Sequence, residues 1–200
     1  ESNINLFINA DISNLIGEEL IKVLDSADYT MFNLEVPLTN KRMPISKCGP
    51  NLIAPIETCR GLAAINPHFF TLANNHILDQ GEQGLLSTME VLNKYNIDFA
   101  GVGMNLENVS KSFIKTIDNI KVGIYCCAEH EFSIATKHSA GVNPYDSLES
   151  FDDVCKLKEE CDYVIVLYHG GKEHYRYPSP MLQRVFHKFA DVGADIVIAQ

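Results

Sequence analysis

Polar residues able to bind metal ions or transfer protons follow four apolar segments that have the pattern of β-strands. They are Asp11 after the first segment, Asn33 and Glu35 after the second, Asn74, Asn75 and His76 after the third, and His169 after the fourth. Carboxylate, amide oxygen and imidazole groups are ligands of divalent ions such as Mn²⁺, Fe²⁺, Zn²⁺ and Mg²⁺. A pair of such ions can generate hydroxide near neutral pH and clamp a phosphoryl or carbonyl group. These residue types therefore predict metal-dependent hydrolysis.

Two of these positions carry the strongest signal for function. The run from Asn74 to His76 directly follows an apolar strand, where polar side chains are costly to bury unless they serve a turn or a site. His169 follows an apolar and aromatic stretch and precedes Gly170 and Gly171, which allow a backbone or ligand to approach closely. We therefore expect both positions to be functional.

Several other polar residues have a structural alternative that the sequence leaves open. Asp11 suits either a metal site or the cap of the following helix, and Asp79 suits either catalysis or the cap of a helix that begins near Gly81. Asn33 and Glu35 suit either the site or a loop in which they satisfy backbone groups. For these residues the type and position alone do not separate the two roles.

The remaining candidates are distinguished by their sequence context. Glu173 and His174 lie close to His169, and we expect them at the rim of the site in contact with substrate. The other histidines have no supporting neighbours, and we interpret them as structural or solvated: His68, His130, His138 and His187.

Strand-like segments alternate with helix-like segments along most of the chain. The expected strands are 5–10, 30–34, 69–73, 97–100, 163–168 and 196–199, with a hairpin of 113–118 and 121–127; the expected helices are 15–24, 56–65, 81–95 and 180–192. Such alternation predicts an α/β fold with a largely parallel sheet covered on both faces. The carboxyl ends of parallel strands share one edge, where the loops that follow form a binding crevice. Residues 37–55 and 133–144 are expected to be surface loops of the same domain.

Composition narrows the classes of protein further. Hydrophobic residues make up 46% of the 200 positions and charged residues 21%, which is ordinary for one globular domain. The net charge of −10, without a basic cluster, argues against a nucleic-acid partner. The longest apolar runs are too short to cross a bilayer. The chain opens at Glu1 without a signal peptide, but an upstream export or anchoring segment is compatible with it, so cytoplasmic and surface-tethered locations both stay open.

The six cysteines contain no CxxC pair, which favours reduced and mostly packed thiols over a disulfide set.

Four sequence segments resemble the CapA family, which is linked to poly-γ-glutamate capsule synthesis. They are FNLEVPLTN, TLANNHILDQGEQGLLSTMEVLNKYNIDFAGVGMN, YVIVLYHGGKEHYRYPSP and VGADIVIAQ. The match runs in order from about Ile4 to the last residue, and ANNH followed by D-x-G and AGVG is a specific combination.

The resemblance implies a fold and a set of roles. CapA proteins are similar to calcineurin-like metallophosphoesterases, which have a layered α/β/β/α sandwich and a two-metal site. The implied metal ligands are Asp11, Glu35, Asn75 and His169, with His76 as the acid that protonates a leaving group. Asn33 and Asn74, next to these positions, are expected to contact substrate. The implied function is a phosphoesterase-like hydrolase acting on a phosphoester or on poly-γ-glutamate, and the alternative is a non-catalytic accessory protein that holds an anionic polymer for a membrane synthase.

This sequence departs from the family pattern in three places. Ala10 stands where the family usually has glycine, and Gly170 stands where it has an aromatic residue. The sequence ends after DIVIAQ, where the family continues into a Gly-His-x-Pro-His segment with further histidine ligands. We therefore expect a CapA-like domain, residues 1–200, that lacks its C-terminal part and some of its metal ligands.

Overall fold

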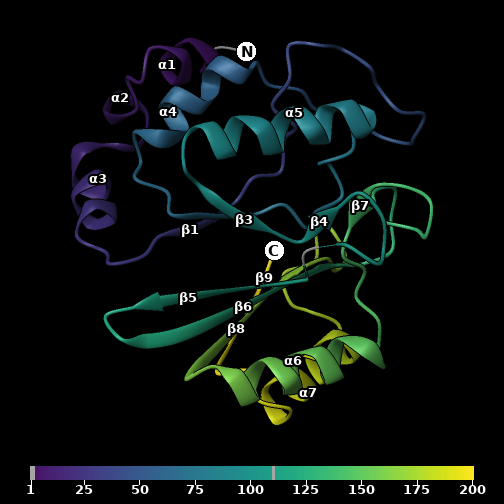
Figure 1. Ribbon diagram of the computed structural model, residues 1–200. Coiled ribbons are helices and arrows are strands. Elements are labelled where there is room, and N and C mark those ends of the chain that lie inside the picture. The colour runs from purple at the N-terminus through teal and green to yellow at the C-terminus, as the bar shows by residue number, and fades with distance from the viewer. Residues whose placement is uncertain (1–2, 110) are drawn as a thin grey trace. The chain divides into compact units, whose positions relative to one another are not determined.

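The computed structural model describes residues 3–109 and 111–200 and has a mixed α/β architecture (Figure 1). The chain divides into two compact units. The first unit comprises the residues up to Thr71 together with His76–Phe99, and the second comprises Leu72–Asn75 and Ala100–Gln200. The boundary between them falls between Asn75 and His76, two of the predicted site residues.

The first unit is built on a three-stranded sheet of order β1-β2-β3. Its elements are α1 (Ile4–Ile8), α2 (Ser13–Ile16), α3 (Glu18–Asp25), β1 (Met31–Asn33), a 3-10 helix (Ile56–Thr58), α4 (Cys59–Ala63), β2 (Phe69–Thr71), α5 (Gly81–Lys94) and β3 (Asp98–Ala100). β1 and β2 are parallel, and Asn33 pairs with Thr71 where both strands end. This pairing confirms that residues after these two strands leave the sheet at one edge.

The predicted first strand, residues 5–10, is wrong, because this segment forms the helix α1. A short apolar run is compatible with either a strand or a buried helix, and periodicity alone does not separate the two. α1 packs on α4, so closely that a Cβ at Gly61 would lie 2.4 Å from the Cα of Phe7. Ala10 follows with a φ of 56°, a left-handed conformation in which glycine is favoured.

The other predicted elements of the first unit are confirmed, with shifted ends. The helical pattern of residues 15–24 is interrupted at Gly17, whose φ of 84° separates α2 from α3. The proline-rich segment 37–55 forms a loop with a single isolated bridge between Leu38 and Ala54.

The second unit contains a four-stranded sheet of order β5-β6-β8-β9 and a two-stranded sheet of β4 and β7. Its elements are β4 (Val102–Gly103), β5 (Ser112–Ile117), β6 (Ile120–Ala128), β7 (Gly141–Val142), α6 (Glu149–Glu160), β8 (Tyr163–His169), α7 (Pro180–Asp191) and β9 (Ile196–Ala199). β6, β8 and β9 run parallel, whereas β5 and β6 form the predicted antiparallel hairpin. Asp118 and Asn119 both have positive φ, as a two-residue type I′ turn requires.

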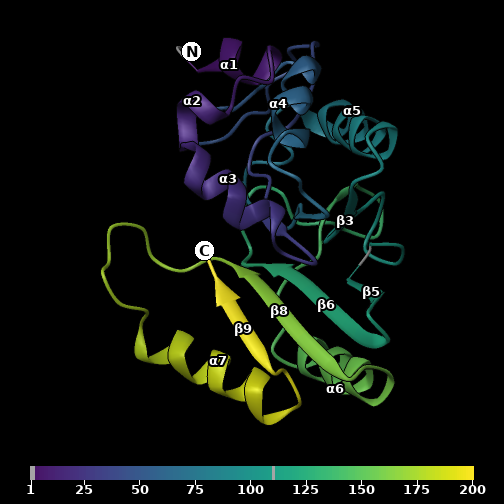
Figure 2. The ribbon, with the colours of Figure 1, turned by 90° about the vertical axis from the view of Figure 1, so that its left-hand side faces the viewer.

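Helices α6 and α7 lie on the same face of the four-stranded sheet (Figure 2). Phe189 of α7 is fully buried there, with its ring centroid 4.8 Å from that of Phe151 and 6.5 Å from that of Tyr168. This packing anchors β8 and thereby places His169 at the end of that strand.

Two features of the second unit differ from expectation. Helix α6 was not predicted, because its sequence is mostly charged and only Ser150, Val154 and Leu157 are buried along one narrow stripe. The prediction of a surface loop at residues 133–144 is partly wrong, because this segment contains β7. It also contains the buried Asn143, whose Nδ2 donates to the carbonyl of Cys126 at 2.8 Å.

All six cysteines are free thiols, and four of them are buried: Cys59, Cys126, Cys127 and Cys161. This confirms that they are mostly packed, and burial raises the pKa of the Cys59 thiol to about 11. Among the described residues, no helix combines the length and apolar character needed to cross a membrane.

Candidate functional site

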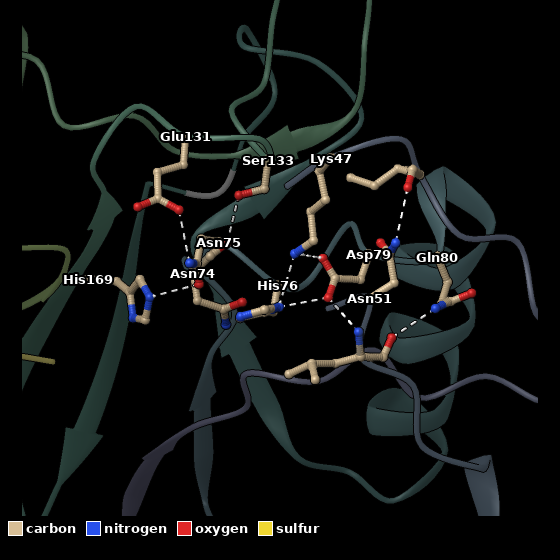
Figure 3. A network of polar contacts seen from close by, with 12 residues as sticks. Lys47, Asn51, Asn74, Asn75, His76, Asp79, Gln80, Glu131, Ser133 and His169 are labelled. Atoms are coloured by element: carbon tan, nitrogen blue, oxygen red, sulfur yellow. Dashed lines mark hydrogen bonds and ion pairs between the residues drawn. The ribbon is translucent and has the colours of Figure 1, made fainter. Parts of the chain in front are cut away.

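Asn75 and His169 meet in the second unit, although they are distant in sequence (Figure 3). Nε2 of His169 lies 3.2 Å from Oδ1 of Asn75. His169 is the last residue of β8 and pairs with Ala128, the last residue of β6. The structure thus brings together two of the four predicted metal ligands.

Glu131 makes a second contact to the Asn75 amide. Nδ2 of Asn75 donates to Oε2 of Glu131 at 2.9 Å. The neighbouring Ser133 is buried, and its hydroxyl donates to the backbone carbonyl of Asn74 at 2.7 Å. Asn74 itself is fully buried, so its side chain belongs to the support of this segment.

Glu129 organises the loop that follows His169. Its carboxylate accepts a hydrogen bond from the Tyr168 hydroxyl at 2.9 Å and another from the Gly171 amide at 3.0 Å. Burial and the contact with Glu129 raise the pKa of Tyr168, so this phenol stays protonated. A Cβ at Gly170 would lie 2.5 Å from Cγ of Glu129, which explains why the loop carries glycine here.

The first unit holds a buried network around Asp79. Lys47 forms an ion pair with Oδ1 of Asp79, and the two side chains are only 2% and 0% exposed. Oδ2 of Asp79 lies 2.7 Å from Nδ1 of His76 and accepts a hydrogen bond from the Leu52 amide at 2.6 Å. Nζ of Lys47 also lies near Nδ1, at 3.1 Å. Because the contact with Asp79 is shorter and two acceptors would repel at 2.7 Å, we assign the proton to Nδ1, which donates to Asp79.

Asp79 therefore does not have the capping role that the sequence left open. The N-cap of α5 is Gln80, without a side-chain cap hydrogen bond. Asp79 instead holds His76 and the proline-rich loop: its backbone carbonyl accepts from the Ile45 amide at 3.0 Å. The Gln80 side chain holds the same loop, accepting from the Met43 amide at 2.8 Å.

The remaining predicted residues of the first unit occupy separate places. Asn33 ends β1 and Glu35 follows it, and Nδ2 of Asn33 donates to the Glu35 carboxylate at 3.2 Å. Asp11 lies between α1 and α2, where both of its oxygens accept from Nδ2 of Asn14 at 2.8 Å. Because Asp11 follows a helix, the strand-end argument no longer supports it, and its role as a ligand stays a prediction from the family resemblance.

Glu173 and His174 lie in the exposed loop after β8, with His174 Nε2 3.9 Å from the Glu173 carboxylate. Their side chains are 87% and 95% exposed, and their place at the rim of a site stays a prediction.

Three charged residues of these networks are not among the residues that the sequence indicates. Glu129 and Glu131 follow β6, so the rule that polar residues after a parallel strand mark a site would have found them. β6 was interpreted only as one arm of a hairpin. Lys47 has no comparable signal, because nothing in the proline-rich loop indicates which side chain is buried.

Two atoms of the second unit that could bind a metal ion fit part of a metal site. Oδ1 of Asn75 and Nε2 of His169 are both ligand atoms for borderline divalent ions, and they already point at each other. The described residues contain no group of three or more His, Cys, Asp or Glu side chains that could hold an ion by themselves. The pair is therefore compatible with two positions of a larger coordination shell.

Comparison with other proteins identifies relatives over most of the chain. It is 28% identical over 184 residues to "Capsule biosynthesis protein CapA" of Bacillus anthracis, covering 88% of this chain and 45% of that protein. It is 29% identical over 202 residues to a "Probable polyglutamine synthesis accessory protein" of Mycobacterium tuberculosis, covering 90% of this chain and 51% of that protein. The chain thus spans about half the length of the curated relatives it matches.

The fold also has a counterpart among solved structures. A "novel phosphatase" of Mycoplasma pneumoniae superposes with a TM-score of 0.50 at 17% identity, covering 96% of this chain and 56% of that one. This likeness shows a shared fold and agrees with the predicted α/β class. The family described as "Bacterial capsule synthesis protein PGA_cap" matches residues 5–200. Because that match extends over nearly the whole sequence, the chain belongs to this capsule synthesis family and is a relative of CapA.

Proposed function

We propose that the complete protein is a metal-dependent hydrolase of the phosphoesterase type that acts in capsule or polyglutamate biosynthesis. The observation that carries the proposal is the approach of His169 Nε2 to Asn75 Oδ1 at 3.2 Å, which joins two ligand atoms from distant parts of the chain. The family membership and the phosphatase-like fold support it.

Asn75 and His169 would supply an amide oxygen and an imidazole nitrogen to a divalent ion of the Mn²⁺, Fe²⁺, Zn²⁺ or Mg²⁺ type. Asp11 and Glu35 are proposed as carboxylate ligands on the strength of the family resemblance. When bound, such an ion would lower the pKa of a coordinated water and polarise the scissile group.

His76 is proposed as the general acid. The contact with Asp79 occupies Nδ1, so the proton for a leaving group would be carried on Nε2. Asp79 is held in turn by Lys47 and by the Leu52 amide, which limits rotation of the carboxylate and hence of the imidazole.

Roles in substrate binding, either direct or through a neighbouring residue, are proposed for four further residues. Glu173 and His174 lie in the exposed loop that follows His169. Asn33 is the last residue of β1, and Asn74 lies three residues after the end of β2. They would act chiefly by ordering their neighbours, because Asn33 binds Glu35 and Asn74 is buried.

The test uses the complete protein. Metal content by elemental analysis should show a bound divalent ion, and hydrolysis of model phosphoesters or of poly-γ-glutamate should require it. His76→Ala should retain the metal and lose turnover. A metal-free protein whose activity survives His76→Ala would refute the proposal.

A second candidate function is a non-catalytic accessory protein that binds an anionic polymer for a membrane synthase. The loop after β8 favours it, because Lys172 and Arg176 lie there against the rings of exposed Tyr175 and Tyr177 in a protein of net charge −10. The Mycobacterium relative is also named as an accessory protein. This alternative predicts binding of glutamate oligomers without turnover, weakened by salt.

A further inference from the structure

The two ends of the Asn75 amide face different partners. Nδ2 faces the Glu131 carboxylate at 2.9 Å, and Oδ1 faces Nε2 of His169 at 3.2 Å. A carboxylate only accepts hydrogen bonds, so it selects the nitrogen end of the amide. A cation requires the opposite end, because the amide oxygen is the ligand atom.

The segment that carries Glu131 is tied to both residues that it would organise. The Ser133 hydroxyl donates to the carbonyl of Asn74, next to Asn75. The Glu129 amide donates to the carbonyl of His169 at 2.9 Å. Glu131 lies between these two anchors in the chain, so its backbone is held close to Asn75 and its exposed side chain can reach the amide.

We propose that Glu131 is a positioning residue for the metal ligand Asn75. By accepting from Nδ2, it holds the amide in the one orientation that turns Oδ1 toward His169 and the ion. The inference rests on the proposed function, in which Asn75 and His169 bind the ion. Groups that orient a ligand in this way typically change metal affinity about 10–100-fold when they are removed.

Two other roles for Glu131 give different results in a variant series. A direct ligand, or a charge that attracts the cation, needs the negative charge. A positioning residue needs only an acceptor atom. Glu131→Gln removes the charge and keeps an acceptor oxygen, whereas Glu131→Ala removes both. Asn75→Asp removes the need for orientation altogether, because its two oxygens are equivalent.

The experiment is Mn²⁺ titration of the complete protein by calorimetry. Glu131→Ala should weaken Mn²⁺ binding about 10-fold or more, and Glu131→Gln should weaken it less. In the Asn75→Asp background, Glu131→Ala should weaken binding much less than it does in the wild type, because either carboxylate oxygen of the aspartate can face the ion. Glu159→Ala, which removes an exposed charge on α6, is the matched control.

The inference is overturned if Glu131→Gln loses as much affinity as Glu131→Ala, or if Glu131→Ala has the same effect in both backgrounds. A second measurement is independent of metal: the side-chain NH₂ resonances of Asn75 should shift in Glu131→Ala and not in Glu159→Ala. If the wild-type protein binds no Mn²⁺, the proposed function fails, and the amide resonances still decide whether Glu131 holds Asn75.

Discussion

The imidazole of His169 and the amide of Asn75 lie 3.2 Å apart, although 94 positions separate them in the sequence. The contact depends on the parallel pairing of β6 and β8, which brings the ends of those strands together. It also depends on the Ser133 and Glu131 contacts that hold the segment containing Asn75. Sheet topology thus brings together two candidate ligands that no single short sequence motif contains.

Substitution of His76 should affect substrates according to their leaving group. His76→Gln should lower kcat about 10²–10⁴-fold for an alkyl phosphoester, whose leaving group needs a proton. The loss should be smaller for a p-nitrophenyl ester, which leaves as a stable anion. Steady-state kinetics on the two esters measure the difference, with His187→Gln on the exposed face of α7 as control. Equal losses on both esters would show that His76 does not act as an acid.

Removal of Lys47 should destabilise the first unit strongly. Lys47→Met leaves the Asp79 carboxylate buried without its ion-pair partner, which costs about 3–5 kcal/mol in comparable cases. The double variant Lys47→Met with Asp79→Asn should lose less stability than Lys47→Met alone, because no unpaired charge remains buried. Urea unfolding measures both, and Lys41→Met, an exposed lysine of the same loop, should change stability by about 0.5 kcal/mol or less. Similar losses for Lys47→Met and Lys41→Met would mean that the ion pair contributes little.

Gly170→Ala should be more harmful than Gly49→Ala. Both glycines have positive φ, 154° and 82°, so both variants introduce backbone strain of about 1–3 kcal/mol. A Cβ at Gly49 meets nothing within 4 Å, whereas one at Gly170 would displace Glu129 and its hydrogen bond from Tyr168. Thermal unfolding of the two variants provides the comparison, and an equal loss would show that the Glu129 contact is dispensable.

Asp195 should make stability depend on pH in the acid range. Burial alone would raise the pKa of Asp195, but hydrogen bonds from Lys158 and the Val164 amide outweigh it and lower the pKa below 3.8. A carboxyl with a lowered folded pKa stabilises the fold above its unfolded pKa, and this contribution is lost as pH falls through the folded pKa. The loss of stability caused by Asp195→Asn, relative to the wild type, should therefore be constant near neutral pH. It should disappear as the pH falls below about pH 4.

The comparison is made by urea unfolding at several pH values, with Asp152→Asn on the exposed face of α6 as control. A deficit that stays unchanged down to pH 2 would contradict the assignment.

Sequence patterns predicted elements whose burial follows a regular period. β8 and the β5–β6 hairpin were found because an apolar run and an Asp-Asn turn identify them locally. α1 was assigned wrongly because a five-residue apolar helix and a short strand have the same composition. α6 was missed because its sequence is mostly charged and its buried residues form only one narrow stripe.

The same distinction applies to the candidate site. The sequence indicates Asn75 and His169 as candidates because each lies close to the end of an apolar, strand-like run. The contact of Lys47 with Asp79 could not be predicted from the sequence, because it depends on how a proline-rich loop folds back on Asp79. A contact between a loop and a residue distant in sequence produces no periodic pattern from which it could be predicted.

The most direct test of the central claim is Mn²⁺ binding to the complete protein and to its Asn75→Ala and His169→Ala variants, measured by calorimetry. The account predicts that the wild type binds the ion and that each substitution weakens binding severely, with His187→Gln unchanged. Equal binding by all four proteins would contradict the claim that these two side chains are metal ligands.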